Sequence, residues 1–146
     1  MNFWSTIKST DVGLLLIRGI TGFILTIQHG GITLLNFIRG QQDYPDPLGL
    51  GPWVTMGLMG FAEFFCALAV ALGFFTRWSV IPLVIGFGVA VFIHHGGDDL
   101  PTVEGAFRYF AVFAGLFFTG AGKLSIDGWR QYQKEKSKAA AVSQKA

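Results

Sequence analysis

The segment from Pro52 to Trp78 constrains the fold more than any other part of the chain. It holds 25 residues from Pro52 to Thr76 with Glu63 as their one charged side chain, and Arg77 follows them. At about 1.5 Å rise per residue, a helix of this length crosses a hydrocarbon core of roughly 30 Å. We therefore expect a membrane-spanning helix with a carboxylic acid well inside it. An ionisable group at that depth costs about 2.5 kcal/mol or more unless it has a partner.

The composition agrees with a membrane protein. Of the 146 residues, 51% are hydrophobic and only 14% are charged, whereas an ordinary soluble domain carries about 25% charged residues. The length leaves room for one domain. The chain has one cysteine, Cys66, so the sequence excludes an internal disulfide, a dithiol redox pair and a cysteine-based zinc site.

Four apolar segments predict an all-α membrane protein, an antiparallel bundle of four transmembrane helices at about residues 12–38, 52–75, 78–95 and 103–121. Asp11 and Arg18 interrupt the first apolar run, so we expect it to be retained and not removed as a signal peptide. Residues 1–129 form the predicted transmembrane domain. Residues 130–146 are polar and basic, and we expect them to be disordered beyond about Tyr132.

The positions of lysine and arginine predict the orientation. With four spans, most lysines and arginines fall on the side of the two termini. On the other side, Arg39 is the one basic residue at the loop 40–51, and the loop 96–102 contains no lysine or arginine. Both termini are therefore expected in the cytoplasm. The residues that decide this are Lys8, Arg77, Lys123, Arg130, Lys134, Lys136, Lys138 and Lys145.

The first helix has one polar face. Arg18 and His29 are 11 residues apart, which at about 100° per residue returns them to within roughly 20° of each other. Intramembrane charges usually pair, and the estimated depths place Arg18 within reach of Glu63. We predict an Arg18–Glu63 contact. The pair either performs chemistry or only fixes the register of two helices.

All three histidines are expected near the outer surface, where His29, His94 and His95 would form a cluster with Asp98 and Asp99. A bis-imidazole haem or a zinc ion is conceivable there, but histidines at helix ends more often have an interfacial role. We predict no metal site. The sequence contains neither a covalent haem motif nor a glycine-rich nucleotide motif.

Four stretches of this sequence together resemble the DoxX family of small four-helix membrane proteins. They cover most of residues 12–128, and the last has the most specific pattern, Gly-x-Gly-basic-x-Ser-x-Asp after the final span. The stretches are Val12–Phe23 with Gln28–Gly30, Ala62–Arg77, Val89–Phe92 with His94 or His95, and Leu116–Asp127.

The resemblance carries the family's polar positions onto this chain. They fall on Arg18, His29, Gly30, Glu63, Arg77, Ser125 and Asp127. Of these, we take Arg77, Ser125 and Asp127 as structural, and Arg18, His29 and Glu63, together with His94 and His95, as candidate ligand-binding residues. Glu63 and His29 are the candidates for catalysis. The family usually has a lysine shortly after the His-Gly pair, where this chain has Thr33.

The family has been linked to respiratory and thiol-related oxidoreductase complexes, including a subunit of a thiosulfate:quinone oxidoreductase. The resemblance thus implies a multi-pass protein of the bacterial cytoplasmic (inner) membrane that belongs to a redox-linked complex. Its polar interior would bind a quinone-like or other polar small molecule, or move protons. The redox centre would lie in a protein partner, and the other contacts would be lipid or further copies of the chain, not nucleic acid. Two alternatives stay open, a small-molecule or lipid-binding transport protein and a structural scaffold without a redox role.

Overall fold

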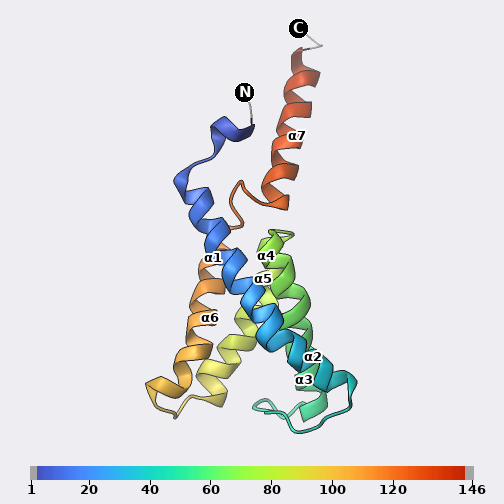
Figure 1. The fold of residues 1–146 in the computed structure, drawn as a ribbon, viewed down its shortest axis with the longest axis vertical. Coiled ribbons are helices and arrows are strands. Elements are labelled where there is room, and N and C mark those ends of the chain that lie inside the picture. The colour runs from blue at the N-terminus through green and yellow to red at the C-terminus, as the bar shows by residue number, and fades with distance from the viewer. Residues whose placement is uncertain (1–2, 144–146) are drawn as a thin grey trace.

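The computed structural model describes residues 3–143, and every regular element within them is a helix (Figure 1). A short 3₁₀ turn, η1 (Phe3–Thr6), comes first. Four long helices then form the body of the molecule, of which the first three each contain a π-helical turn and the fourth is a continuous α-helix. A last helix, α7, follows them. Their segments are α1 (Ser9–Leu25), η2 (Thr26–Gly30) and α2 (Gly31–Ile38); α3 (Pro52–Phe61), η3 (Ala62–Cys66) and α4 (Ala67–Leu72); α5 (Thr76–Val89) and η4 (Ala90–His94); α6 (Leu100–Thr119); and α7 (Ile126–Ser143).

Each of the three long helices contains a π turn, in which the backbone N–H bonds to the carbonyl five residues earlier. These turns are η2, η3 and η4. For example, the N–H of Gly31 donates to Thr26 and that of Ala67 to Ala62. π turns are rare and often occur at functional sites. Here they carry three of the side chains that the sequence analysis singles out, His29, Glu63 and His94.

The helices pair antiparallel along the chain. α1 packs against α4, α2 against α3, and α5 against α6. Figure 1 shows both termini at one end of the molecule and the two long loops at the other. α1 and α4 approach closely through small residues, because a β-carbon at Gly22 would lie 2.8 Å from the carbonyl oxygen of Ala67. Small residues at helix contacts are typical of membrane bundles.

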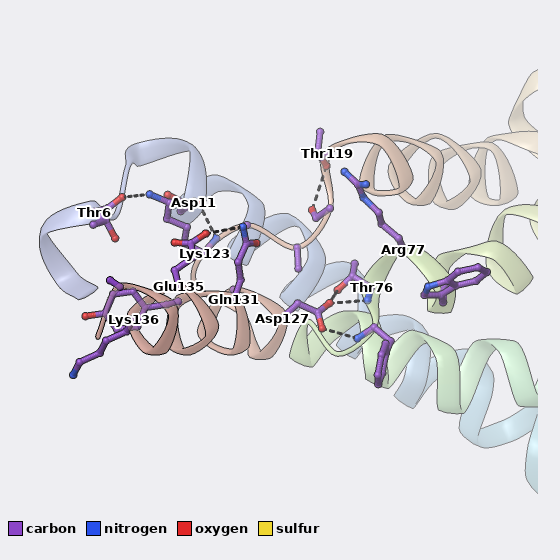
Figure 2. A pocket seen from close by; sticks show the side chains of 18 residues that line it. Thr6, Asp11, Thr76, Arg77, Thr119, Lys123, Asp127, Gln131, Glu135 and Lys136 are labelled. Carbon is purple, nitrogen blue, oxygen red and sulfur yellow. Dashed lines mark hydrogen bonds between the residues drawn. The ribbon is translucent and has the colours of Figure 1, made fainter. Parts of the chain in front are cut away.

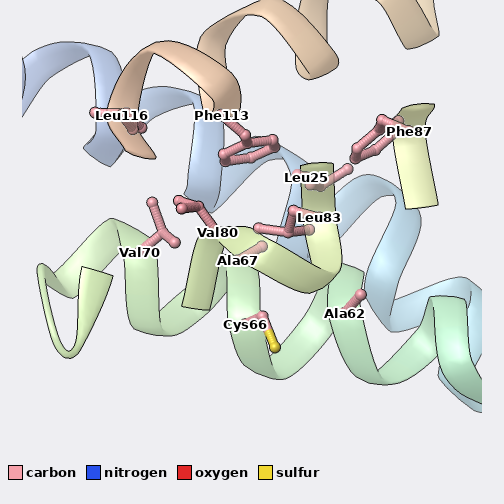
Figure 3. Packing of buried hydrophobic residues seen from close by; sticks show 10 residues of the cluster. All are labelled: Leu25, Ala62, Cys66, Ala67, Val70, Val80, Leu83, Phe87, Phe113 and Leu116. Carbon is pink, nitrogen blue, oxygen red and sulfur yellow. The ribbon is translucent and has the colours of Figure 1, made fainter. Parts of the chain in front are cut away.

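A buried core joins α1, η3, α4, α5 and α6 (Figure 3). Leu25, Val70, Leu83 and Phe113 are each 0% exposed. The opposite faces of the helices leave large apolar side chains exposed, including Leu16, Ile20, Phe61, Ile85 and Phe118. An apolar core surrounded by an apolar exterior is the pattern expected when lipid is the solvent. The chain is therefore a membrane protein.

Within residues 3–143, three helices, and not the expected four, are long and apolar enough to cross a membrane. They are Ser9–Ile38, Pro52–Leu72 and Thr76–His94. The fourth expected span forms α6, a helix of 20 residues, but Pro101, Glu104 and Arg108 reduce the apolar character of its first half. The prediction of an all-α protein is therefore confirmed, whereas the composition of the described residues supports three spans and not four.

Two ends differ from the sequence-based expectation. The first helix begins at Ser9 and not at residue 12, after an N-cap at Lys8 whose backbone N–H donates to Asp11 Oδ2 (2.9 Å). The tail expected to be disordered beyond about Tyr132 is helical as far as Ser143, and residues 144–146 lie outside the described part of the chain. Alanine, lysine, glutamate and glutamine dominate residues 131–141, and these residue types favour helix.

Candidate functional site

Arg18 does not contact Glu63, so the predicted ion pair is wrong. The Arg18 side chain is 1% exposed, and its Nη1 donates to the carbonyls of Val70 (3.3 Å) and Ala71 (2.6 Å) at the end of α4. Its Nη2 donates to the carbonyl of Leu124, in the segment before α7. Arg18 therefore stabilises a helix C-terminus, where carbonyls lack intrahelical partners and a cation is favoured.

The register of the two helices explains the error. Gly22 of α1 lies against Ala67 and Ala71, and Gly30 of η2 lies against Glu63. Glu63 is thus level with residue 30, about 12 residues and roughly 18 Å along the helix from Arg18. The depth estimate failed because the first turns of α1 extend past the end of α4, which leaves Arg18 level with that end.

Asp127 holds the α4–α5 turn from a distant part of the chain. Its Oδ1 accepts a hydrogen bond from the N–H of Phe75 (3.0 Å), and its Oδ2 accepts from the N–H (2.9 Å) and Oγ1 (3.1 Å) of Thr76 (Figure 2). The N–H of Asp127 in turn donates to the carbonyl of Gly73 (2.9 Å). Asp127 thereby caps the N-terminus of α5, and the conformation of Gly73, with φ +70°, fits the tight turn.

The rest of the Gly-x-Gly-basic-x-Ser-x-Asp segment is also tied down. The N–H of Lys123 donates to Asp11 Oδ1 (2.8 Å), and its Nζ donates to the carbonyl of Thr6 (2.8 Å). Ser125 Oγ accepts from the N–H of Gly128 (2.9 Å). The segment thus joins the N-terminal turns, α4, α5 and α7 in one hydrogen-bonded network.

Glu63 lies in a different environment, in η3 at the middle of the second helix. Its side chain is 5% exposed, and Thr33 Oγ1 donates to its Oε2 (3.1 Å). A β-carbon at Gly30 would overlap the carbonyl group of Glu63, so only glycine permits this approach of η2 to η3. The described residues give Glu63 no cationic partner within ion-pair distance.

Two tyrosines from other elements lie within electrostatic range of Glu63. Tyr44 comes from the loop between α2 and α3, and Tyr109 comes from α6. Burial raises the pKa of Tyr44 to about 12, and the charge of Glu63 acts in the same direction. Tyr44 therefore keeps its proton at physiological pH and can donate a hydrogen bond.

Asp46 fixes the loop that carries Tyr44. Its carboxylate accepts hydrogen bonds from Thr55 Oγ1 (2.8 Å) and from the N–H groups of Gly51 (2.7 Å) and Leu50 (3.0 Å). These bonds, that of Thr55 first, hold the pKa of Asp46 below its ordinary value of 3.8. The loop is thereby attached to the first turn of α3.

The histidines fall into two groups and not into the single cluster expected. His29 is exposed, and its ring lies edge-on to Tyr109 with centroids 5.8 Å apart. His94 and His95 contact each other (4.5 Å), and His95 Nδ1 lies 2.7 Å from Asp98 Oδ2. Asp99 instead accepts from Thr102 Oγ1 (2.6 Å). Within the described part of the chain, no three His, Cys, Asp or Glu side chains are placed to hold a metal ion.

Tyr109 connects His29 to the core. Its ring stacks on Phe87 (5.1 Å) and on Phe113 (6.3 Å). Sequence reasoning missed both Tyr44 and Tyr109 as candidates, and it placed Thr33 near the polar face of the first helix without pairing it with Glu63. A tyrosine in an apolar helix next to an arginine was the available signal for Tyr109, whereas nothing in the sequence places the loop residue Tyr44 near Glu63.

Comparison with known proteins supports the family resemblance. The DoxX family model matches residues 13–96, which contain Arg18, His29, Thr33 and Glu63. The match does not extend to the segment with Ser125 and Asp127. No curated protein and no solved structure matches the chain. Because the matched region is more than half of the sequence, the chain belongs to the DoxX family.

Proposed function

We propose that this DoxX protein is an integral membrane subunit of a redox-linked complex in which Glu63 binds the polar headgroup of a quinone-like molecule and exchanges a proton with it. One observation carries the proposal. Glu63 is an acid buried in an apolar helix, without a cationic partner in the described residues; Thr33 donates a hydrogen bond to it, and Tyr44 and Tyr109 lie within its electrostatic range. Buried ionisable groups in membrane helices are functional candidates.

The groups around Glu63 fit the chemistry of a quinone headgroup. Thr33 donates to one carboxyl oxygen and so orients the group. Tyr109 and His29 offer a hydroxyl and an imidazole beside stacked aromatic rings, which suit a flat ring with two carbonyl oxygens. His29 is exposed on the apolar exterior, so a ligand dissolved in the lipid can reach it. Arg18, bound to three backbone carbonyls, takes no part.

Reduction of a quinone to a quinol consumes two electrons and two protons. Glu63 in its acid form supplies a proton to one carbonyl oxygen, and His29, nearer the exterior, supplies or relays the second. The chain carries a single cysteine and no haem or nucleotide motif, so a protein partner supplies the electrons.

The proposal includes a topology of four spans with both termini in the cytoplasm. An even number of crossings agrees with the arrangement in Figure 1, where both termini lie at one end. α6 supplies the fourth crossing, since its 20 residues span about 30 Å. A reporter fused after Ser143 is expected to give a cytoplasmic signal, and an external signal contradicts this topology.

The decisive experiment compares Glu63→Gln with Glu104→Gln, an exposed acid on α6. Purified wild-type protein is expected to retain extractable quinone. The Glu63→Gln variant should assemble normally in the membrane but retain at least tenfold less quinone per protein molecule. Glu104→Gln should retain quinone like the wild type. If all three proteins retain equal amounts of quinone, the proposal is contradicted and the scaffold alternative is favoured. Wild-type protein that retains another small molecule instead of quinone supports the binding or transport alternative.

A further inference from the structure

A cavity lined by both polar and apolar side chains lies at the end of the molecule that carries the termini, far from Glu63 along the helices. Its volume is about 1150 Å³, and its walls come from the α4–α5 turn, the segment after α6, and one side of α7 (Figure 2). Arg77, Trp78 and Thr119 line it on the bundle side, and Gln131 and Glu135 line it on the α7 side. The family match covers the α4–α5 side of this cavity but not the segment after α6 or α7, and the proposed function does not use it.

Arg77 is a cation in this cavity whose N–H donors are largely available for a ligand. Its side chain is exposed, and the hydrogen bond recorded for it, from Nη2 to the carbonyl of Phe118, is long at 3.4 Å. A guanidinium has five N–H donors in a planar fork that matches phosphate oxygens. Asp127 lines the same cavity but accepts three hydrogen bonds from Phe75 and Thr76 (Figure 2), and in the described part of the chain it forms no ion pair with Arg77.

The position of Arg77 along its helix matches the depth at which lipid headgroups lie in a membrane. Arg77 is the second residue of the apolar span Thr76–His94. Its neighbours Phe75, Trp78 and Phe118 are 52%, 74% and 78% exposed, and exposed aromatic side chains at the end of a span mark the membrane interface. A phosphate bound by Arg77 would thus lie where phospholipids place theirs, with acyl chains beside Trp78 and Phe118.

The two ends of the molecule also differ in charge, and the difference favours an anionic ligand at the end with the termini. The end with the termini carries more basic than acidic residues, namely Lys8, Arg77, Lys123, Arg130, Lys134, Lys136 and Lys138 against Asp11, Asp127 and Glu135, whereas the loop end carries Asp43, Asp46, Asp98, Asp99 and Glu104 against Arg39 and Arg108. A phosphate diester is therefore attracted to the end that holds the cavity.

We propose that this cavity binds one membrane phospholipid, with the phosphate at Arg77 and the headgroup extending between the bundle and α7 toward Gln131 and Glu135. The occupant is a phospholipid and not free phosphate, because the exposed aromatic side chains beside Arg77 offer contact to acyl chains. α7 therefore forms one wall of a lipid site in addition to extending the chain.

Native mass spectrometry of the full chain, delipidated in detergent and titrated with phosphatidylglycerol, tests the proposal. The wild type is expected to bind one lipid, and Arg77→Gln to weaken that binding at least fivefold. Arg39→Gln, at the opposite end, is the matched control and should bind like the wild type. Equal binding by Arg77→Gln and the wild type overturns the proposal.

A second variant keeps the test valid if Arg77→Gln destabilises the fold. Gln131→Trp enlarges an exposed residue on α7 and fills the cavity without altering Arg77, so it should also weaken lipid binding at least fivefold. Addition of millimolar inorganic phosphate should leave the bound lipid in place. Displacement of the lipid by phosphate alone, or unchanged binding by Gln131→Trp, contradicts the assignment.

Discussion

Gly30 and Glu63 lie in direct backbone contact, so that η2 and η3 meet without space for a β-carbon at residue 30. This contact sets the register between the first two long helices and, through it, the placement of Thr33 beside the Glu63 carboxyl group. It also separates Arg18 from Glu63 by the length of three helical turns.

Gly30→Ala is expected to destabilise the protein by about 1–3 kcal/mol, because the added methyl group forces two helices apart. The measurement is unfolding in a mixed detergent and denaturant series. Gly19→Ala is the matched control, since a β-carbon there has nothing within 4 Å. That variant should be neutral or stabilised by up to about 1 kcal/mol. Similar changes in the free energy of unfolding of both variants would contradict a special role for the contact between Gly30 and Glu63.

Arg18 and Glu63 should behave as independent sites. In a double-mutant cycle with Arg18→Met and Glu63→Gln, we expect the free energies of unfolding to add within about 0.5 kcal/mol, because the residues share no partner. Arg18→Met alone should cost about 3 kcal/mol, since it leaves the carbonyls of Val70, Ala71 and Leu124 without their donor. A coupling energy of about 1 kcal/mol or more would instead support the direct Arg18–Glu63 contact that was predicted from the sequence.

Asp127→Ala should destabilise the end of the bundle that carries the termini by about 2 kcal/mol. The change removes the acceptor for two backbone N–H groups and one hydroxyl at the start of α5, which is equivalent to the loss of a helix cap. Hydrogen exchange at Phe75 and Thr76 should accelerate. Asp43→Ala, at an exposed loop position, serves as the control and should leave exchange at both amides unchanged.

The loop between α2 and α3 should loosen in acid. The pKa of Asp46 is lowered in the folded protein, so its carboxylate stabilises the loop above the ordinary value of 3.8 and loses this effect as the pH falls through the lowered value. Limited proteolysis between Gln41 and Leu50 should thus be slow at pH 7 and faster at a pH below the lowered pKa, with the cleavage rate at both values normalised to that of an unstructured peptide substrate cut by the same protease. Asp46→Asn should be cleaved readily at both. A wild-type loop that resists cleavage equally at both pH values contradicts this role.

The sequence predicted the helical architecture well because long apolar runs and their breaks depend on local composition. Pro52 at a helix start and the Pro- and Gly-rich loop before it were readable in this way. The site was less predictable, since the Arg18–Glu63 pairing required the register of two helices. That register depends on Gly22 and Gly30 contacts with Ala67 and Glu63, which no property of a single helix reveals.

The π turns escaped prediction for a related reason. A π turn differs from the surrounding α-helix by one extra residue in one turn, and the apolar composition of Thr26–Gly30 or Ala90–His94 does not mark it. The turn changes which face the following side chains occupy. The helical period placed Thr33 near the polar face of the first helix, but only the register between η2 and η3 reveals that it meets Glu63.

The π turn that contains Glu63 also has a consequence for the history of the sequence. A helix acquires such a turn when one codon is inserted and the packing on both sides is preserved. Related chains that lack the insertion would present an ordinary α-helix, with the residue aligned to Glu63 rotated by about 100° away from Thr33. Single-residue gaps inside a transmembrane helix would then separate relatives that keep the buried acid in this setting from those that have lost it.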